Sequence, residues 1–266
     1  MSKLTLIKLG GSVITDKTKP YTARPEIIRN LALEIKEAWN KGHRFVVAHG
    51  SGSFAHTSAA RFSTAEGLKN KESVYGLAVV QQDAIAINRI VNEIFLKKKL
   101  PVLSFVPSSF SLANKKKLSQ IFFEPIAESL KAGALPLVFG DIILDKNLGC
   151  CIFSGEKTLD NLIKPLQKSG FQIERIIQVG STDGVYDDEG KTVPKITPGN
   201  FSQIKKLLKK PKTTDVTGGM IHKIEESLKM AEQKTDVLII NGETKGNLLK
   251  AILGKNPGGT LICRTR

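Results

Sequence analysis

The chain has 266 residues, with 40 Lys and Arg against 25 Asp and Glu, which gives a formal net charge of +15. Hydrophobic residues make up 41% and charged residues 24%, a balance that excludes collagen-like, low-complexity and disordered chains. No uninterrupted apolar run reaches the roughly 18 residues of a membrane-spanning helix, so we predict no membrane association. Lys8 interrupts the apolar stretch near the N-terminus, so we expect no secretory signal.

Strands and helices alternate along the sequence. Residues 3–9 predict a strand that ends at a Gly-Gly pair, and residues 26–40 have helical spacing of apolar side chains. The remaining predicted elements are, in chain order, a strand at 44–48, a helix at 73–97, a strand at 101–106, a helix at 125–131, a strand at 135–139, a hairpin at 141–153 that turns at 147–149, a helix at 158–167, a strand at 175–179, a second hairpin at 185–196, a helix at 219–232, a strand at 237–240, a helix at 246–253 and a strand at 260–263.

This alternation is typical of a mainly parallel sheet that is covered by helices on both faces. We therefore predict the α/β fold class, with a three-layer αβα sandwich formed as one domain over residues 1–266. The region 102–141 is the candidate seam between an N-terminal and a C-terminal lobe.

Cysteine and histidine usage argues against disulfides and structural zinc. The three cysteines include the adjacent pair Cys150 and Cys151, which cannot form an unstrained bridge to each other. Such usage is typical of reduced thiols in a cytoplasmic protein. The four histidines show no metal-ligand spacing and no CxxC pair occurs, so we predict no metal-ligating residue.

Four glycine-rich turns indicate a phosphate ligand. Three of them, at residues 8–12, 50–53 and 180–184, follow predicted strands, and the fourth, at 217–219, opens a predicted helix. Glycine lets the backbone approach a phosphate closely, and a helix N-terminus supplies free N–H groups and a favourable dipole. One such turn would indicate only a tight bend, but four in one chain favour an anion site beyond the carboxyl ends of the strands.

Two stretches of the sequence resemble familiar nucleotide-binding motifs. Residues 50–55 fit the dinucleotide pattern G-x-G-x-x-G/A, but that pattern belongs to the first strand–helix–strand unit and His56 follows it directly. Residues 190–192 resemble the end of a P-loop, but Val185 stands at the required glycine and no strand precedes it, so we reject a P-loop.

The positive charge attracts anions, either nucleotide phosphates or nucleic acid. Lysines gather at 97–99, 115–117 and 205–212, and none of these runs is interleaved with aromatic side chains as a single-strand binding surface would be. The last run, with Lys205, Lys206, Lys209 and Lys210, reads as the polar side of an amphipathic helix. We predict no nucleic-acid partner.

Seven motifs in this order carry a resemblance to a known family: KLGGSVITDK at 8–17, HGSGSFAH at 49–56, VPSSF at 106–110, FGD at 139–141, FSGE at 153–156, TDGVYD at 182–187 and DVTGGMIHK at 215–223. Over essentially the whole chain the sequence resembles the amino acid kinase superfamily and, within it, the isopentenyl phosphate kinase family. The histidine of the G-x-G-S-F-x-H stretch marks that branch. The resemblance implies an amino acid kinase-like fold, an acceptor-binding lobe at about 1–140, a nucleotide-binding lobe at about 141–266, and a homodimer.

The implied activity is the transfer of phosphate from ATP, with Mg²⁺, to isopentenyl monophosphate in isoprenoid biosynthesis. The residues implied to bind the nucleotide are Lys8, Leu9, Gly10, Gly11, Ser12, Gly52, Ser181, Asp183, Gly219 and Lys223. Those implied to hold the acceptor phosphate are Ser51, His56 and Gly155. Lys17 would stabilise the transferring γ-phosphoryl group, and Lys8, Lys17 and His56 are the candidate catalytic residues.

Departures from the family pattern keep two alternatives open. Ala55 stands where a glycine is common, Glu156 and Lys157 replace two aspartates, and Ser181 stands where an acid is common. The acceptor could instead be another prenyl or alkyl phosphate, a phosphonate or a carboxylate, or the chain could be a catalytically weak nucleotide-binding regulator or a nucleic-acid binder. The chemistry itself suits these residues, because an ionised phosphate acceptor requires no strong general base.

Overall fold

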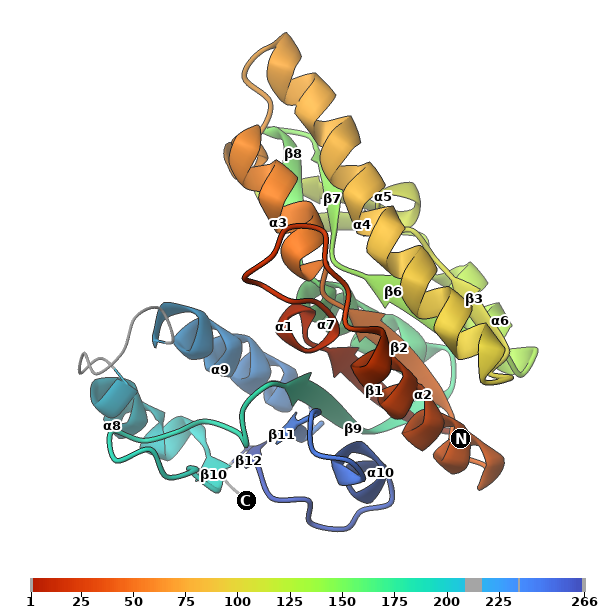
Figure 1. Cartoon of the computed structure of the whole chain (residues 1–266), viewed down its shortest axis with the longest axis vertical. Coiled ribbons are helices and arrows are strands. Elements are labelled where there is room, and N and C mark those ends of the chain that lie inside the picture. The colour runs from red at the N-terminus through yellow and green to blue at the C-terminus, as the bar shows by residue number, and fades with distance from the viewer. Residues whose placement is uncertain (1, 209–216, 234, 265–266) are drawn as a thin grey trace.

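The computed structural model describes residues 2–208, 217–233 and 235–264. The chain is built on an eight-stranded sheet (Figure 1). Its strands are, in spatial order, β10 (Lys195–Ile196), β12 (Thr260–Ile262), β11 (Val237–Asn241), β9 (Phe171–Gly180), β1 (Ser2–Leu9), β2 (Phe45–His49), β6 (Leu135–Phe139) and β3 (Val102–Ser104). Neighbouring strands are parallel except β11 and β12, so the predicted mainly parallel sheet is confirmed.

Helices cover both faces of this sheet, each over its own apolar core. Alternate residues of a strand point to opposite faces, so Leu6 of β1 joins one core and Ile7 joins the other. The core that contains Ile7 packs against α2 (Pro25–Asn40), α4 (Lys71–Lys97) and α10 (Asn247–Ile252). The core that contains Leu6 packs against α6 (Glu124–Lys131), α7 (Gly155–Lys168), α8 (Pro198–Leu208) and α9 (Thr217–Glu232). The predicted three-layer sandwich is confirmed.

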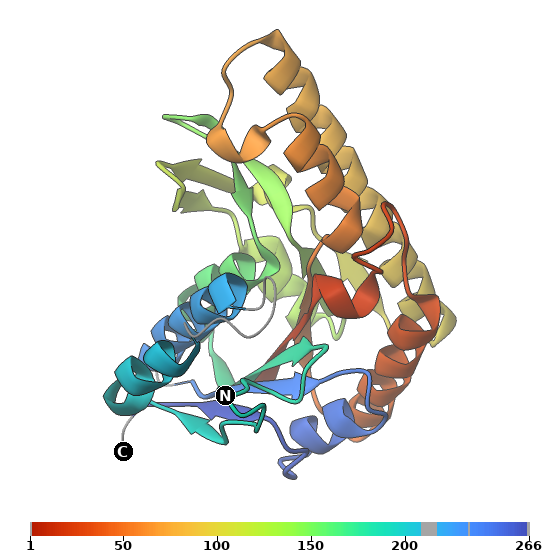
Figure 2. The same cartoon turned by 60° about the vertical axis from the view of Figure 1, so that its left-hand side comes forward.

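A smaller, four-stranded sheet extends one end of the molecule (Figure 2). Its order is β5 (Lys117–Ile121), β4 (Ser111–Asn114), β7 (Asp141–Asp145) and β8 (Gly149–Phe153). The short helices α1 (Gly11–Ile14) and α5 (Pro107–Phe110), the 3₁₀ turn at Thr64–Glu66, and α3 (Gly52–Arg61) complete the described elements. Figures 1 and 2 both place α3, α4 and this sheet at one end, and α8, β10 and β12 at the other.

The local sequence explains where the long helices begin and end. The Asn70 side chain accepts a hydrogen bond from the backbone N–H of Ser73, and the Ser73 hydroxyl accepts one from the Asn70 N–H, which forms a capping box at the start of α4. Gly42, at φ +90°, follows the end of α2 in a conformation that favours glycine. Both helices therefore lie close to their predicted ranges.

One predicted stretch differs in part from the structure, and two elements were not predicted. Residues 185–193 fold back on themselves, as the predicted hairpin-like stretch requires: the N–H of Val193 donates to the Val185 carbonyl, and an isolated antiparallel bridge joins Tyr186 to Thr192. The end of the predicted range, β10, pairs with β12 instead. A turn held by the Asp187 carboxylate, which accepts from two backbone N–H groups, separates the bridged residues. Helix α3 was not predicted, because its Gly- and Ser-rich start reads as a loop. The β4–β5 hairpin was not predicted either.

Some predictions fall outside the described residues. Lys209, Lys210 and the Asp215–Val216 part of the DVTGGM motif belong to that group. The described part of the predicted amphipathic helix is α8, which buries Ile204. Among the described residues, no helix combines the length and apolar character needed to cross a membrane.

Candidate active site

A cavity of about 510 Å³ lies beyond the carboxyl ends of β1, β2 and β6, where a parallel sheet commonly binds its ligands. The structure brings eleven of the fourteen predicted site residues to its wall. They are Lys8, Gly10, Gly11, Ser12, Lys17, Ser51, Gly52, His56, Gly155, Gly219 and Lys223. Residues separated by more than two hundred positions in the sequence therefore share one space.

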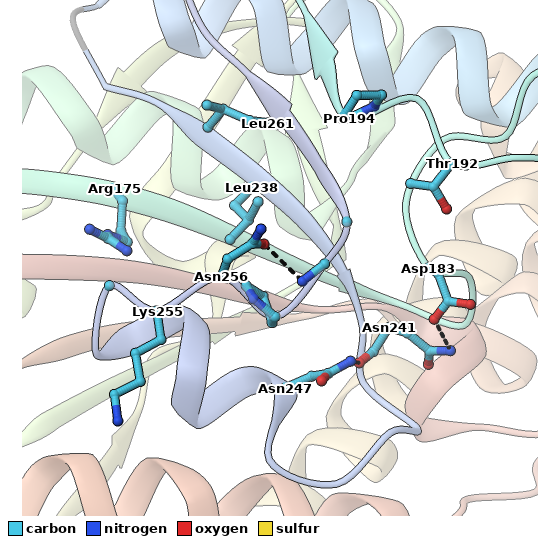
Figure 3. A pocket seen from close by; sticks show the side chains of 14 residues that line it. Arg175, Asp183, Thr192, Pro194, Leu238, Asn241, Asn247, Lys255, Asn256 and Leu261 are labelled. Carbon is cyan, nitrogen blue, oxygen red and sulfur yellow. Dashed lines mark hydrogen bonds between the residues drawn. The ribbon is translucent and has the colours of Figure 1, made fainter.

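The other three predicted residues lie elsewhere. The side chain of Leu9 is fully buried in the core, although its carbonyl accepts from the N–H of Gly50. Ser181 is exposed, with its hydroxyl 3.5 Å from that of Ser12. Asp183 accepts from the Asn241 amide and lines a separate pocket of about 650 Å³ beside the loop 254–259 (Figure 3).

The first two glycine turns are in direct backbone contact. A Cβ atom on Gly11 would lie 2.8 Å from the backbone N of Gly52, and one on Gly52 would lie 2.8 Å from the Gly11 carbonyl oxygen. Gly52 also has φ +51°, which disfavours other residues. The two turns can approach this closely only as glycines, and together they form a cradle whose walls are backbone.

Helix N-termini face the same cavity. Helix α3 starts at Gly52 with Ser51 as its N-cap, and α7 starts at Gly155 with Ser154 as its N-cap. Gly219 lies in the first turn of α9. The N–H of Ser53 is taken by the Thr15 hydroxyl and that of Lys157 by the Ser154 hydroxyl, but the positive ends of the helix dipoles still favour an anion here.

Three lysines add positive charge. Lys8 is only 6% exposed and pairs with Glu156 of α7. Burial raises the pKa of Glu156, but the neighbouring Lys8 ammonium outweighs it and holds that pKa below its ordinary value. Burial, with the charge of Lys8 beside it, lowers the pKa of Lys223 to about 8. Lys17 is exposed, and no ion pair within the described ranges engages it.

The two histidines of the HGSGSFAH motif differ in environment. His56 lies on α3 and faces the cavity, and burial together with the charge of Lys17 lowers its pKa. His49 is fully buried, where its ring pairs with the Gly50 carbonyl and the Asn88 amide, and burial lowers its pKa to about 4. His49 is therefore a buried structural residue beneath the site, whereas His56 is part of the site itself.

One end of the cavity is apolar. Its wall consists of Ala55, Ala59, Ala60, Ala65, Val80, Ile152 and Phe153. On α4, Val80 lines the cavity, whereas Leu77 and Val91 pack in the cores. Ala55 and Ala59 are four residues apart on α3, so recognising that helix would have predicted them as neighbours on one face.

The FGD motif at 139–141 also reaches the cavity, through Gly140 and Asp141, which were not among the fourteen predicted site residues. The Ser51 hydroxyl donates to the Gly140 carbonyl, and the buried Asp141 carboxylate accepts from the backbone N–H of Ser108. Burial raises the pKa of Asp141. Across the described parts of the chain, no group of three or more His, Cys, Asp or Glu side chains is placed to hold a metal ion.

Comparisons with known proteins agree with this geometry. The model of the amino acid kinase family matches residues 3–241. The isopentenyl phosphate kinase of Methanothermobacter thermautotrophicus is 32% identical over 97% of this chain and 98% of its own length. That of Methanocaldococcus jannaschii is 31% identical over 96% and 97%. A crystal structure of isopentenyl phosphate kinase superposes with a TM-score of 0.81 at 28% identity, over 97% of this chain and 100% of that one. Every cavity residue named above falls within the matched range.

Proposed function

The chain belongs to the amino acid kinase family and, within it, to the isopentenyl phosphate kinases, and from this membership we propose that it phosphorylates isopentenyl monophosphate with ATP. The products are isopentenyl diphosphate and ADP, a step of isoprenoid biosynthesis. The observation that supports this acceptor is one cavity with a cationic end lined by glycines and an apolar end lined by alanines. A short prenyl phosphate needs both ends at once.

We propose the roles of the site residues from the family resemblance, and the cavity that most of them share supports these roles. Lys8, the Gly10–Ser12 turn, Gly52, Gly219 and Lys223 contact the nucleotide phosphates. The turn at 180–184 lies beside Gly10, Ser12 and Lys223. Lys17 neutralises charge on the γ-phosphoryl group. Ser51, His56 and Gly155 hold the acceptor phosphate, and the apolar wall takes the prenyl tail.

The reaction needs positioning and charge neutralisation more than proton transfer. An oxygen of the acceptor phosphate attacks the γ-phosphorus, the bond from that phosphorus to the β–γ bridging oxygen breaks, and ADP leaves with the electron pair. The acceptor oxygen is already ionised, because the second pKa of a phosphate monoester is about 6. His56 donates a ring N–H to the acceptor phosphate, which an imidazole can do in its neutral or its charged form.

Mg²⁺, which shields phosphate charge when bound, is proposed to enter with the nucleotide. The two carboxylates at the cavity already have partners, Glu156 with Lys8 and Asp141 with the Ser108 N–H. The side chains in the described ranges therefore do not form a dedicated metal site, and phosphate oxygens suit Mg²⁺ as ligands. We also propose a cytoplasmic homodimer, on the family resemblance and on three cysteines that are all free.

The test is ADP release from Mg-ATP with isopentenyl monophosphate, measured for the wild type, His56→Ala and His222→Ala. Loss of the N–H donated to a charged phosphate lowers kcat/KM for the acceptor by about tenfold to a hundredfold. His222 is an exposed residue of α9 outside the cavity, so its variant keeps wild-type turnover.

Two other results are informative. Equal activity in His56→Ala and wild type would remove His56 from the acceptor site and leave the kinase. A wild type with no turnover would contradict the proposed acceptor. A panel of other phosphates, phosphonates and carboxylates would then identify the acceptor, starting from the altered stretch at 154–157.

A further inference from the structure

Lys17 is carried by a loop rather than by a helix or strand. Residues 15–24 leave α1 and return to α2, closed at the base by a bridge between Thr15 and Ala23 (Figure 1). The backbone N–H of Asp16 donates to the Thr22 carbonyl across this loop at 2.9 Å. An exposed lysine on such a loop has many conformations to lose, so its ammonium stays in place only where the loop is fastened elsewhere.

Tyr21 fastens the tip of this loop to two helices. Its backbone N–H donates to the Ser53 carbonyl at 3.2 Å, and its ring packs edge-on against Phe54 with centroids 5.8 Å apart. Its hydroxyl donates to the Asp83 carboxylate of α4 at 3.2 Å. Tyr21 also has φ +52°, a conformation that a residue with a side chain rarely adopts without a tertiary reason.

The two helices that Tyr21 contacts, α3 and α4, also line the acceptor end of the cavity. Ser53 and Phe54 belong to the same turn of α3 as His56, and Asp83 lies one turn after Val80 on α4. The contacts of Tyr21 therefore set the position of the loop, and of Lys17 within it, relative to the acceptor site. In phosphoryl transfer the rate depends steeply on the alignment of donor and acceptor.

We propose that Tyr21 and Asp83 are positioning residues for phosphoryl transfer, and that their hydrogen bond holds the Lys17 loop in register with the acceptor helices. This inference rests on the proposed function of the cavity. Neither side chain lines the cavity, so both act through Lys17.

The base of the loop is held independently. Arg24 donates to the Ser12 carbonyl at 3.2 Å and pairs with Glu243, which follows β11, at 2.5 Å. Removing the Tyr21 hydroxyl therefore frees the tip from α4, while the base, the backbone bond to Ser53 and the Phe54 contact remain. Tyr21→Phe is expected to fold as the wild type does.

The structure supplies a matched control. Tyr75 lies on α4, packs edge-on against Phe62 at 5.9 Å, is 66% exposed and makes no hydroxyl hydrogen bond within the described ranges. We expect Tyr21→Phe to lower kcat by about threefold to tenfold with the acceptor KM changed less than about twofold, and Tyr75→Phe to change neither. Asp83→Ala reproduces the loss, and the double variant Tyr21→Phe/Asp83→Ala is no slower than either single variant.

A second experiment separates positioning from general stability. In a Lys17→Ala background, Tyr21→Phe causes no further fall in kcat, because the side chain that it positions is gone. The same fold-loss in both backgrounds, or a Tyr21→Phe enzyme with wild-type kcat, would overturn the inference. So would full activity of Lys17→Ala, since Lys17 would then have nothing to position.

Hydrogen exchange tests the fastening without turnover. The amides of residues 16–22 exchange several-fold faster in Tyr21→Phe than in Tyr75→Phe if the hydroxyl holds the loop. Equal exchange in the two variants overturns the inference even where the wild type is active. A wild type that does not phosphorylate isopentenyl monophosphate contradicts the proposed function, while faster exchange in Tyr21→Phe alone would still show the fastening.

Discussion

Lys223 gives nucleotide binding a pH dependence of its own. Burial, reinforced by the Lys8 charge, lowers its pKa to about 8, so the free protein loses this positive charge as the pH rises through that value. Only the charged form attracts the phosphates, so kcat/KM for ATP falls above that pH by up to about tenfold per pH unit. Lys223→Arg keeps its charge, because a guanidinium does not titrate in this range, and its profile stays flat. Steady-state rates measured between about pH 6.5 and about pH 9.5 check this. The same fall in the arginine variant would assign the ionisation to another group.

Single residues show what the sequence can and cannot reveal about the site. The lysines, glycines and His56 were found because motifs carry them within short stretches. The pairing of Lys8 with Glu156 was not, because it joins residues from β1 and α7 that only the folded sheet brings together. The replacement of an aspartate by Glu156 read as a departure, yet its longer side chain pairs directly with the buried lysine.

Single elements were predicted best where their own side chains form the core. The apolar strands β2 and β6 are buried throughout, and both were predicted. The β4–β5 hairpin was missed, because all four residues at 114–117, where the chain turns, are polar and β5 is mostly exposed. Its turn contains Lys115 and Lys116 at φ +51° and +63°, and it is held by a residue of β7.

We expect replacement of that residue, Asp145, to cause a measurable loss of stability. Its carboxylate accepts from the backbone N–H groups of Lys115, Lys116, Asn147 and Leu148, and so joins the turns of two hairpins. Asp145→Ala leaves these donors without their partner, and the free energy of unfolding falls by about 2–3 kcal/mol. Asp187→Ala is the control, because Asp187 accepts only within its own exposed turn, and it costs less than about 1 kcal/mol.

The pKa of Asp145 predicts how that loss of stability depends on pH. Burial raises the pKa of Asp145, but the four N–H donors outweigh it and lower the pKa to about 2, below the ordinary value of 3.8. A carboxylate whose pKa is depressed by folding stabilises the fold above its ordinary pKa, and the contribution is lost as the pH falls towards 2. Urea unfolding at about pH 5 and about pH 2.5 should show the difference between wild type and Asp145→Ala shrinking at the lower pH. A difference independent of pH would mean that the charge is not what holds the turns.

At the scale of the molecule, the layers could be predicted and the order of the strands could not. Alternating strands and helices require a parallel sheet with two covered faces, whatever the order. The order places β1 between β9 and β2, so strands from before and after residue 140 form one continuous sheet. Sequence periodicity carries no information on that adjacency, which depends on side-chain packing between distant segments.

The cavity takes its walls from segments at 8–17, 50–65, 140–156 and 219–223, so its ligands contact both predicted lobes. A ligand that binds only the folded form stabilises everything that unfolds together with its site. We therefore expect a non-hydrolysable ATP analogue at about one hundred times its Kd to add about 2.7 kcal/mol. In calorimetry this raises one cooperative transition by roughly 5–10 °C. Isopentenyl monophosphate does the same, and His56→Ala reduces its shift by half or more while keeping that of the nucleotide. Two transitions, of which a ligand moves only one, would show instead that the two lobes unfold separately.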